Sequence, residues 1–248
     1  MARNVIITGG GTGIGRAAAR SFAAEGDQVL LLGRRAEVLE RAGVPGALTF
    51  AADLSTVEGA RGAAEFAADA LRGAVDVIVH SAGGHGGREP EDDVGDDPLD
   101  AVAHRWNTNF RINTLTTVLL TEALRDRLAS PGGRVLFISS IAALRGSGTG
   151  AYGASKAALH PYAFDLAKAL GPRGITVNVV APGYIEDTEF FGYEMSDEEY
   201  ARRVSATLTG RAGTLRDMAS TLLWLASPGA GHVTAQVIQV NGGEMPGR

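Results

Sequence analysis

A glycine-rich loop between a short apolar run and an alanine-rich segment restricts the fold of this chain more than any other feature. The run Asn4–Thr8 is typical of a buried parallel strand. The loop reads Thr-Gly-Gly-Gly-Thr-Gly-Ile-Gly up to Gly15, and the segment Ile14–Glu25 after it is helix-like. A glycine cluster alone is more often a plain turn, but glycines placed between a strand and a helix let a backbone approach a pyrophosphate closely. The sequence therefore predicts a dinucleotide phosphate site at a helix N-terminus.

The same alternation of strand and helix continues along all 248 residues without a linker or an internal repeat. We expect strands at Asn4–Thr8, Gln28–Gly33, Leu48–Ala52, Asp76–His80, Arg134–Ser139, Thr176–Ala181 and Gln236–Val240. We expect helices at Ile14–Glu25, Ala36–Ala42, Thr56–Leu71, Leu99–Leu128, Tyr152–Leu170 and Leu215–Ala226. This order predicts an α/β fold, a single doubly wound Rossmann-type domain over residues 1–248, with a roughly seven-stranded parallel sheet and helices on both faces. Ligands of such sheets bind at the carboxyl ends of the strands.

Tyr152 and Lys156 are four residues apart in the run Ala-Tyr-Gly-Ala-Ser-Lys, so on a helix they lie on one face. A lysine beside a phenol favours the phenolate and lowers the pKa of the tyrosine from its free value of about 10. Such a tyrosine can give a proton to a carbonyl oxygen or take one from an alcohol. The pair alone also fits a surface helix, but together with the phosphate loop it indicates carbonyl–alcohol interconversion.

These motifs together resemble the short-chain dehydrogenase/reductase family, in its single-domain branch, over nearly the whole chain. Further matches occur in order along the sequence: Asp53-Leu54, His80-Ser81-Ala82-Gly83, Asn113, Ser139-Ser140, Pro182-Gly183 and Asn241-Gly242-Gly243. The stretch from Gly174 to Gly183 is most similar to the 3-oxoacyl-carrier-protein reductase and related ketoreductases. His80 and Ser81 stand where the family usually has two asparagines, which puts side-chain hydrogen bonds there in doubt.

The resemblance implies a catalytic set of Asn113, Ser140, Tyr152 and Lys156. In such a set Tyr152 donates the proton, Ser140 holds the substrate oxygen, and Lys156 lowers the tyrosine pKa and binds the nicotinamide ribose. Asn113 holds a water that extends the proton relay. Ser139 stays open as the alternative to Ser140, because Ser140 is only twelve residues before the tyrosine and strand side chains alternate.

The resemblance also implies an NAD(P) site made from the glycine loop and the later strand ends. The expected contacts are Gly9, Gly11, Thr12, Gly13, Ile14, Gly15, Arg34, Arg35, Asp53, Leu54, Ser81, Ala82, Gly83, Tyr152, Lys156, Pro182, Gly183, Ile185 and Thr188. The second strand ends at Gly33 with no carboxylate for the adenosine ribose, and two arginines follow. Arginine suits a 2′-phosphate, so NADP(H) is preferred and NAD(H) stays possible. The arginines could instead only begin a solvated helix.

Residues 184–209 carry four aromatic side chains and a methionine among acidic ones, namely Phe190, Phe191, Tyr193, Tyr200 and Met195. By position, this insertion indicates a substrate-covering lid, although a packing helix would have a similar pattern. The acidic run Glu89–Asp100 follows the fourth strand and borders the expected site. We expect it to be a solvated loop that disfavours acidic partners such as acyl carrier protein.

Composition excludes several classes of function. The chain has no cysteine, so it carries no disulfide, thiol chemistry or thiolate metal site, and we expect no metal. Its net charge of −5 argues against nucleic acid or an anionic membrane as a partner. No apolar run approaches the ~18 residues of a membrane span, and the first strand begins too early for a signal peptide. We expect a cytoplasmic location, and the resemblance implies a homotetramer or homodimer.

The leading functional hypothesis is NADP(H)-dependent reduction of a ketone to a secondary alcohol. One alternative is an NAD-dependent alcohol dehydrogenase on the same fold. The other is a nucleotide-binding regulator without chemistry, since fold does not fix function. The complete set of expected catalytic residues argues against the regulator.

Overall fold

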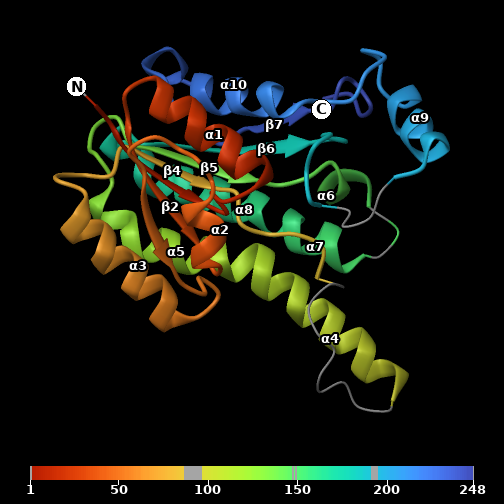
Figure 1. The fold of residues 1–248 in the computed structure, drawn as a ribbon, viewed down its shortest axis with the longest axis horizontal. Helices are drawn as coiled ribbons and strands as arrows, with labels where there is room; N and C mark the ends of the chain where they lie inside the picture. The colour runs from red at the N-terminus through yellow and green to blue at the C-terminus, as the bar shows by residue number, and fades with distance from the viewer. Residues whose placement is uncertain (1, 87–96, 147, 149, 191–194, 248) are drawn as a thin grey trace.

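Seven parallel strands form one sheet at the centre of the computed structural model, which describes residues 2–86, 97–146, 148, 150–190 and 195–247 (Figure 1). The strand order is β3-β2-β1-β4-β5-β6-β7. The bounds are β1 Asn4–Thr8, β2 Gln28–Gly33, β3 Leu48–Ala51, β4 Val77–His80, β5 Arg134–Ile138, β6 Thr176–Pro182 and β7 Val237–Val240. The predicted α/β class and parallel sheet are confirmed, and each strand boundary lies within one residue of its expected place.

The order of the strands reverses at β1. Val5 of β1 pairs with Val29 of β2 on one side and with Val77 of β4 on the other. The strands β2 and β3 therefore lie on one side of β1, and β4 to β7 follow one another on its other side. The loops after β1 and β4 diverge at this point, which is where doubly wound sheets open a crevice for a ligand.

Helices cover both faces of the sheet (Figure 1). Their bounds are α1 Gly13–Ala24, α2 Ala36–Glu40, α3 Val57–Ala70, α4 Pro98–Phe110, α5 Thr116–Leu124, α6 Ala142–Arg145, α7 Ala151–Ala157, α8 Leu159–Leu170, α9 Asp197–Ser205 and α10 Leu215–Leu225. Alternate side chains of β1 point to opposite cores: Val5 and Ile7 pack with α1 and α10, whereas Ile6 packs with α3, α5 and α8.

Two helices that the sequence predicts as continuous are interrupted. The segment expected at Leu99–Leu128 is α4, a π-helical turn at Arg111–Leu115, α5, and a short 3₁₀ turn. The segment expected at Tyr152–Leu170 divides at Ala158 into α7 and α8. Pro161 explains the second break, because it cannot donate a hydrogen bond to the carbonyl four residues earlier. The short helices α6 and α9 were not predicted.

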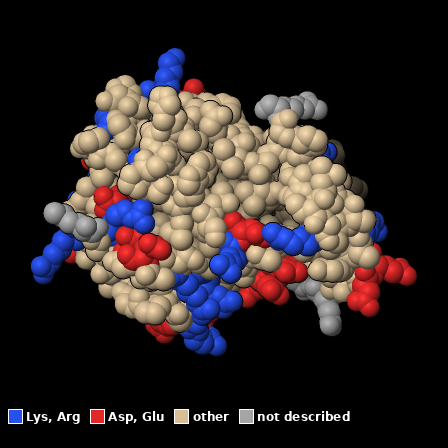
Figure 2. Space-filling model, turned by 90° about the horizontal axis from the view of Figure 1, so that it is seen from above, with Lys and Arg blue, Asp and Glu red and all other residues tan. Residues whose placement is uncertain are grey.

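None of the helices in the described ranges is long and apolar enough to cross a membrane. On the face seen in Figure 2, acidic and basic side chains lie next to one another and much of the surface is uncharged. Much of the acidic run, residues 89–96, lies outside the described residues, as do Phe191, Tyr193 and Glu194 of the predicted lid.

Candidate active site

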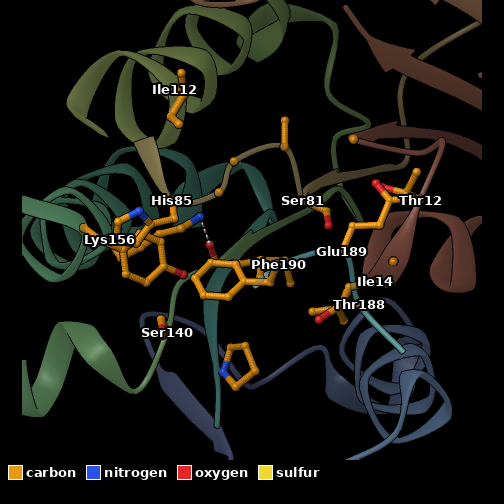
Figure 3. Close-up of a pocket in the computed structure, with 18 of the residues that line it drawn as sticks. Thr12, Ile14, Ser81, His85, Ile112, Ser140, Lys156, Thr188, Glu189 and Phe190 are labelled. Carbon is orange, nitrogen blue, oxygen red and sulfur yellow. Dashed lines mark hydrogen bonds between the residues drawn. The ribbon is translucent and has the colours of Figure 1, made fainter. Parts of the chain in front are cut away.

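A cavity of about 1280 Å³ opens at the carboxyl ends of the strands (Figure 3). It is large enough for a dinucleotide together with a small molecule, since drug-sized pockets occupy roughly 300–1,000 Å³. Nearly all predicted site residues line it: Gly9, Gly11, Thr12, Gly13, Ile14, Arg34, Arg35, Asp53, Leu54, Ser81, Ala82, Gly83, Ser140, Tyr152, Lys156, Pro182, Gly183, Ile185 and Thr188. Gly15 and Asn113 lie behind the wall rather than on it.

The loop after β1 fits a pyrophosphate group. A Cβ atom on Gly15 would stand 2.3 Å from the carbonyl oxygen of Gly9, so only glycine allows the loop to close this tightly over the start of α1. Thr12 is the N-cap residue of α1, and its side chain makes no capping hydrogen bond. The first N–H groups of the helix therefore meet the cavity without a side-chain cap, an arrangement that suits an anion.

Arginine side chains surround the far end of the cavity, beyond β2 and β3. The Arg35 guanidinium lies 4.0 Å from the carboxylate of Glu189, which belongs to the segment after β6. Asp53 forms an ion pair of 3.6 Å with Arg111. Burial acts to raise the pKa of Asp53, but hydrogen bonds from Ser55 and the nearby arginine charges hold it below its ordinary value. This end of the cavity therefore holds several arginine side chains together with the carboxylates of Asp53 and Glu189.

Ser140, Tyr152 and Lys156 meet on the wall opposite the phosphate loop. The Ser140 hydroxyl lies beside the Tyr152 phenol and acts to lower its pKa. The Lys156 Nζ atom donates a 2.9 Å hydrogen bond to the Ile138 carbonyl at the end of β5. Tyr152 is 7% exposed and Lys156 is 4% exposed, so both groups sit in a desolvated environment.

The pKa of Tyr152 moves in the direction opposite to the expected one. Burial raises it to about 12, and the Ser140 hydrogen bond only partly offsets this. Burial also lowers the pKa of Lys156 to about 8. The predicted lowering of the tyrosine pKa by the lysine is thus wrong, because loss of water disfavours the charged form of each group.

Ser140, rather than Ser139, faces the phenol. The Ser139 hydroxyl bonds instead to the Lys156 carbonyl at 3.1 Å and to the His160 imidazole at 2.8 Å. Ser140 lies two residues beyond Ile138, the last residue of β5, so its side chain is free of the strand alternation and turns toward Tyr152. Ser139 and His160 tie the end of β5 to the start of α8.

Asn113 is buried in the π-helical turn and binds protein groups. Its Oδ1 accepts a hydrogen bond from the Gly84 N–H, and its Nδ2 donates to the Gly84 carbonyl, both at 3.0 Å. Nδ2 also lies 3.2 Å from the Ser155 hydroxyl of α7. The side chain therefore holds the loop after β4 against α7.

Several residues that line the cavity were not among the site residues predicted from the sequence. Arg145 of α6 forms an ion pair with Glu244 near the C-terminus, and both line the cavity with Tyr184 and Arg203. Arg145 and Glu244 are 99 positions apart, so one sequence offers no signal that joins them. His80 was noted for its unusual identity; its buried ring bonds to Thr121 of α5 at 2.9 Å, facing away from the cavity. No group of three or more metal-binding side chains occurs among the residues with described positions.

Comparison with known proteins gives consistent matches along the chain. A family model described as Enoyl-(Acyl carrier protein) reductase matches residues 9–244. Nodulation protein G of Rhizobium sp. (strain N33) is 34% identical over 246 residues, covering 97% of this chain and 96% of that protein. The 3-oxoacyl-[acyl-carrier-protein] reductase FabG of Escherichia coli (strain K12) is 31% identical, covering 96% of this chain and 95% of that protein. A crystal structure described as a short-chain dehydrogenase/reductase of the glucose/ribitol dehydrogenase type, from Brucella melitensis, has a TM-score of 0.85 at 31% identity, covering 99% of this chain and 97% of that one.

Proposed function

The chain belongs to the short-chain dehydrogenase/reductase family, and on that premise we propose that it is an NADPH-dependent ketoreductase that uses Tyr152 as proton donor. The family assignment makes the protein an NAD(P)-dependent oxidoreductase acting on CH–OH and C=O groups. One observation carries the finer proposal: the Ser140 and Tyr152 hydroxyl groups and the buried Lys156 line the same cavity as the phosphate loop. Two adjacent hydroxyl donors in a desolvated wall suit a carbonyl oxygen on which negative charge develops.

The residues that line the cavity fit the parts of an NADP(H) molecule. The loop from Gly9 to Gly15 and the start of α1 suit the pyrophosphate, and we expect Asp53, which lines the same cavity, to bind the adenine. Arg34 and Arg35 line the same end, where a 2′-phosphate would gain charge-assisted hydrogen bonds. A bound nicotinamide cofactor supplies the hydride for the carbonyl carbon.

Side chains of the protein supply the proton for the reaction. Tyr152 has a pKa of about 12, so at neutral pH it is protonated and ready to donate. Ser140 orients the carbonyl oxygen by a second hydrogen bond. Once the proton leaves, the phenolate needs a cation, and Lys156 is the cation on the next turn of α7. Asn113 supports this set by fixing the loop after β4 and α7, and we retain the expectation of a relay water beside it as part of the proposal.

We also propose that residues 184–209 cover the substrate. The Phe190 ring packs on Tyr152 with 5.2 Å between ring centroids, which contributes to the burial of the phenol (Figure 3). Helix α9 has no buried residue and attaches through partly exposed side chains: the Arg203 guanidinium lies over the Tyr184 ring, and the Tyr200 ring contacts the same tyrosine. Attachment by such contacts rather than by a buried core suits a segment that opens and closes.

A homotetramer or homodimer is part of the proposal. Helix α4 projects from the body of the protein (Figure 1) and exposes Leu99, Val102 and Trp106, with Leu99 72% exposed. Large exposed apolar side chains on one element favour a protein partner, and a second copy is the partner that the family resemblance implies. A cytoplasmic location stays a prediction from the cysteine-free sequence.

The test uses the wild-type protein. NADPH and NADH are titrated separately by cofactor fluorescence, and a panel of ketones is then assayed with the tighter-binding cofactor. The proposal expects tighter binding of NADPH and ketone-dependent NADPH oxidation. Preferential NADH binding would instead support the alcohol dehydrogenase alternative, and binding of neither cofactor would refute the enzyme proposal.

A further inference from the structure

Two hydrogen bonds that run in opposite directions join Lys156 to the end of β5. The Lys156 Nζ atom donates to the Ile138 carbonyl at 2.9 Å, and the Lys156 carbonyl accepts from the Ser139 hydroxyl at 3.1 Å. The side chain of the lysine thus binds the backbone of the strand, while a side chain just beyond the strand binds the backbone of the lysine. Lys156 and Ser139 are both buried, so both bonds are shielded from water.

The position of Lys156 in its helix explains why its carbonyl takes a partner from another element. Lys156 lies in the last turn of α7, just before the break at Ala158. Carbonyl groups at a helix end are bonded by groups from outside the helix. The Ser139 hydroxyl is such a group, and the placement of this turn of α7 against β5 therefore depends on it.

The Ser139 hydroxyl has a second partner, which decides where its hydrogen points. The His160 Nε2 atom lies 2.8 Å from the Ser139 Oγ atom. A hydroxyl has one hydrogen and a carbonyl can only accept, so the bond to Lys156 uses that hydrogen. Nε2 must then carry a proton and donate it to Oγ. Burial lowers the pKa of His160, so at neutral pH the ring is neutral and holds its one N–H at Nε2.

We propose that His160 is a positioning residue for Lys156, acting through the Ser139 hydroxyl. The inference rests on the proposed role of Lys156 in ketone reduction. By donating to the Ser139 Oγ, the imidazole leaves the hydroxyl hydrogen for the Lys156 carbonyl. This bond holds the lysine where its Nζ atom reaches Ile138. An apolar residue at position 160 would leave the hydroxyl without a fixed direction, and a residue that only accepts would take its hydrogen from Lys156.

The pair of bonds sets the relative placement of the groups that face the substrate. Tyr152 and Lys156 are one turn apart on α7, whereas Ser140 follows β5, and all three line the cavity. A shift of α7 against β5 would therefore move the phenol and the ammonium together, away from Ser140. Small misplacements of this kind lower the rate of a reaction whose groups must be aligned.

The first test needs neither a substrate nor a cofactor. In wild-type protein with ¹⁵N-labelled histidine, the ring nitrogen shifts of His160 at neutral pH should be those of the Nε2–H tautomer. The signals of His160 are the ones lost in His160→Gln. The Nδ1–H tautomer would overturn the inference, because the Ser139 hydrogen would then point to the ring.

The second test compares the turnover of variants with a ketone and NADPH. Glutamine can place a donor where Nε2 stands, whereas leucine has none. His160→Leu should lower kcat about tenfold, the effect of one hydrogen bond, with little change in the Kd of NADPH. His160→Gln should recover most of this loss. His232→Leu, which changes an exposed histidine outside the cavity, should keep wild-type turnover. Adding His160→Leu to Ser139→Ala should cause no further loss.

Losses that add in the double variant, or equal losses in His160→Leu and His160→Gln, would assign His160 to packing alone and overturn the inference. With ¹³Cε-labelled lysine, the pKa of Lys156 should rise from about 8 in His160→Leu, because a displaced ammonium gains water. An unchanged pKa would also overturn the inference. If His160→Leu does not fold, as its melting temperature shows, the tautomer and the lysine pKa in Ser139→Ala decide. A wild type that reduces no carbonyl compound refutes only the proposed function, since both NMR readouts are independent of turnover.

Discussion

Lys156 is a buried cation that forms no ion pair with a carboxylate of the described residues, and replacing it should change the pH dependence of stability in a defined way. Its ammonium bonds to the Ile138 carbonyl, and burial lowers its pKa from 10.5 to about 8. In the unfolded chain the lysine keeps its ordinary pKa. Below pH 8 both states carry the charge, and the folded state then bears the full cost of burying it.

The size of the effect follows from the two pKa values. A difference of 2.5 units corresponds to about 3 kcal/mol, at roughly 1.4 kcal/mol per unit. Between pH 8 and 10.5 the unfolded state binds the extra proton, so stability rises with pH in this window. Lys156→Met removes this contribution. The free energy of unfolding of the wild type minus that of the variant should therefore rise by about 2 to 3 kcal/mol from pH 7 to 10.

The assay is urea unfolding of the ligand-free protein at several pH values, with Lys168→Met as control. Lys168 is the other lysine in the sequence and lies exposed on α8. With lysine labelled at ¹³Cε, NMR should show two side-chain signals, and the one lost in Lys156→Met should titrate near pH 8. A pH-independent difference between wild type and variant, or titration of Lys156 at the same pH as Lys168, would refute the reasoning.

Two further predictions concern the cofactor. Arg34→Ala should weaken NADPH binding about tenfold or more while changing NADH binding little, because a charge-assisted hydrogen bond to a 2′-phosphate is worth roughly 1.5–3 kcal/mol. The control in the same fluorescence titration is Arg61→Ala, which changes an exposed arginine. Equal losses for both cofactors would contradict the assignment of Arg34 to the 2′-phosphate. Gly15→Ala should abolish binding of both cofactors, because its Cβ would meet the Gly9 carbonyl at 2.3 Å, and retained binding with an unchanged melting temperature would show that the loop is not held as described.

The sequence predicts the sheet well because its signals are local. Each strand is a short apolar run bounded by turn residues, and the strands of a parallel sheet covered by helices on both faces are typically such runs. The phosphate loop is equally local, since one strand, one loop and one helix define it. The same reasoning located Tyr152 and Lys156, which share one helical turn.

The features that sequence reasoning missed depend on distant contacts. The direction of the Tyr152 pKa shift depends on burial, to which Phe190 contributes from the segment after β6. The π-helical turn at Asn113 bonds to Gly84 and Ser155, which belong to other parts of the chain. Local spacing predicts neither, because it does not say what covers a side chain.

The central claim is that Tyr152 donates the proton in ketone reduction, and the most direct measurement compares Tyr152→Phe with wild type. The account predicts that the variant binds NADPH as the wild type does but loses at least a hundredfold in kcat, the usual contribution of a positioned proton donor. Tyr162→Phe, which removes a phenol outside the cavity, should keep wild-type turnover. Turnover by Tyr152→Phe within a few-fold of the wild type, with NADPH binding intact, would contradict the account.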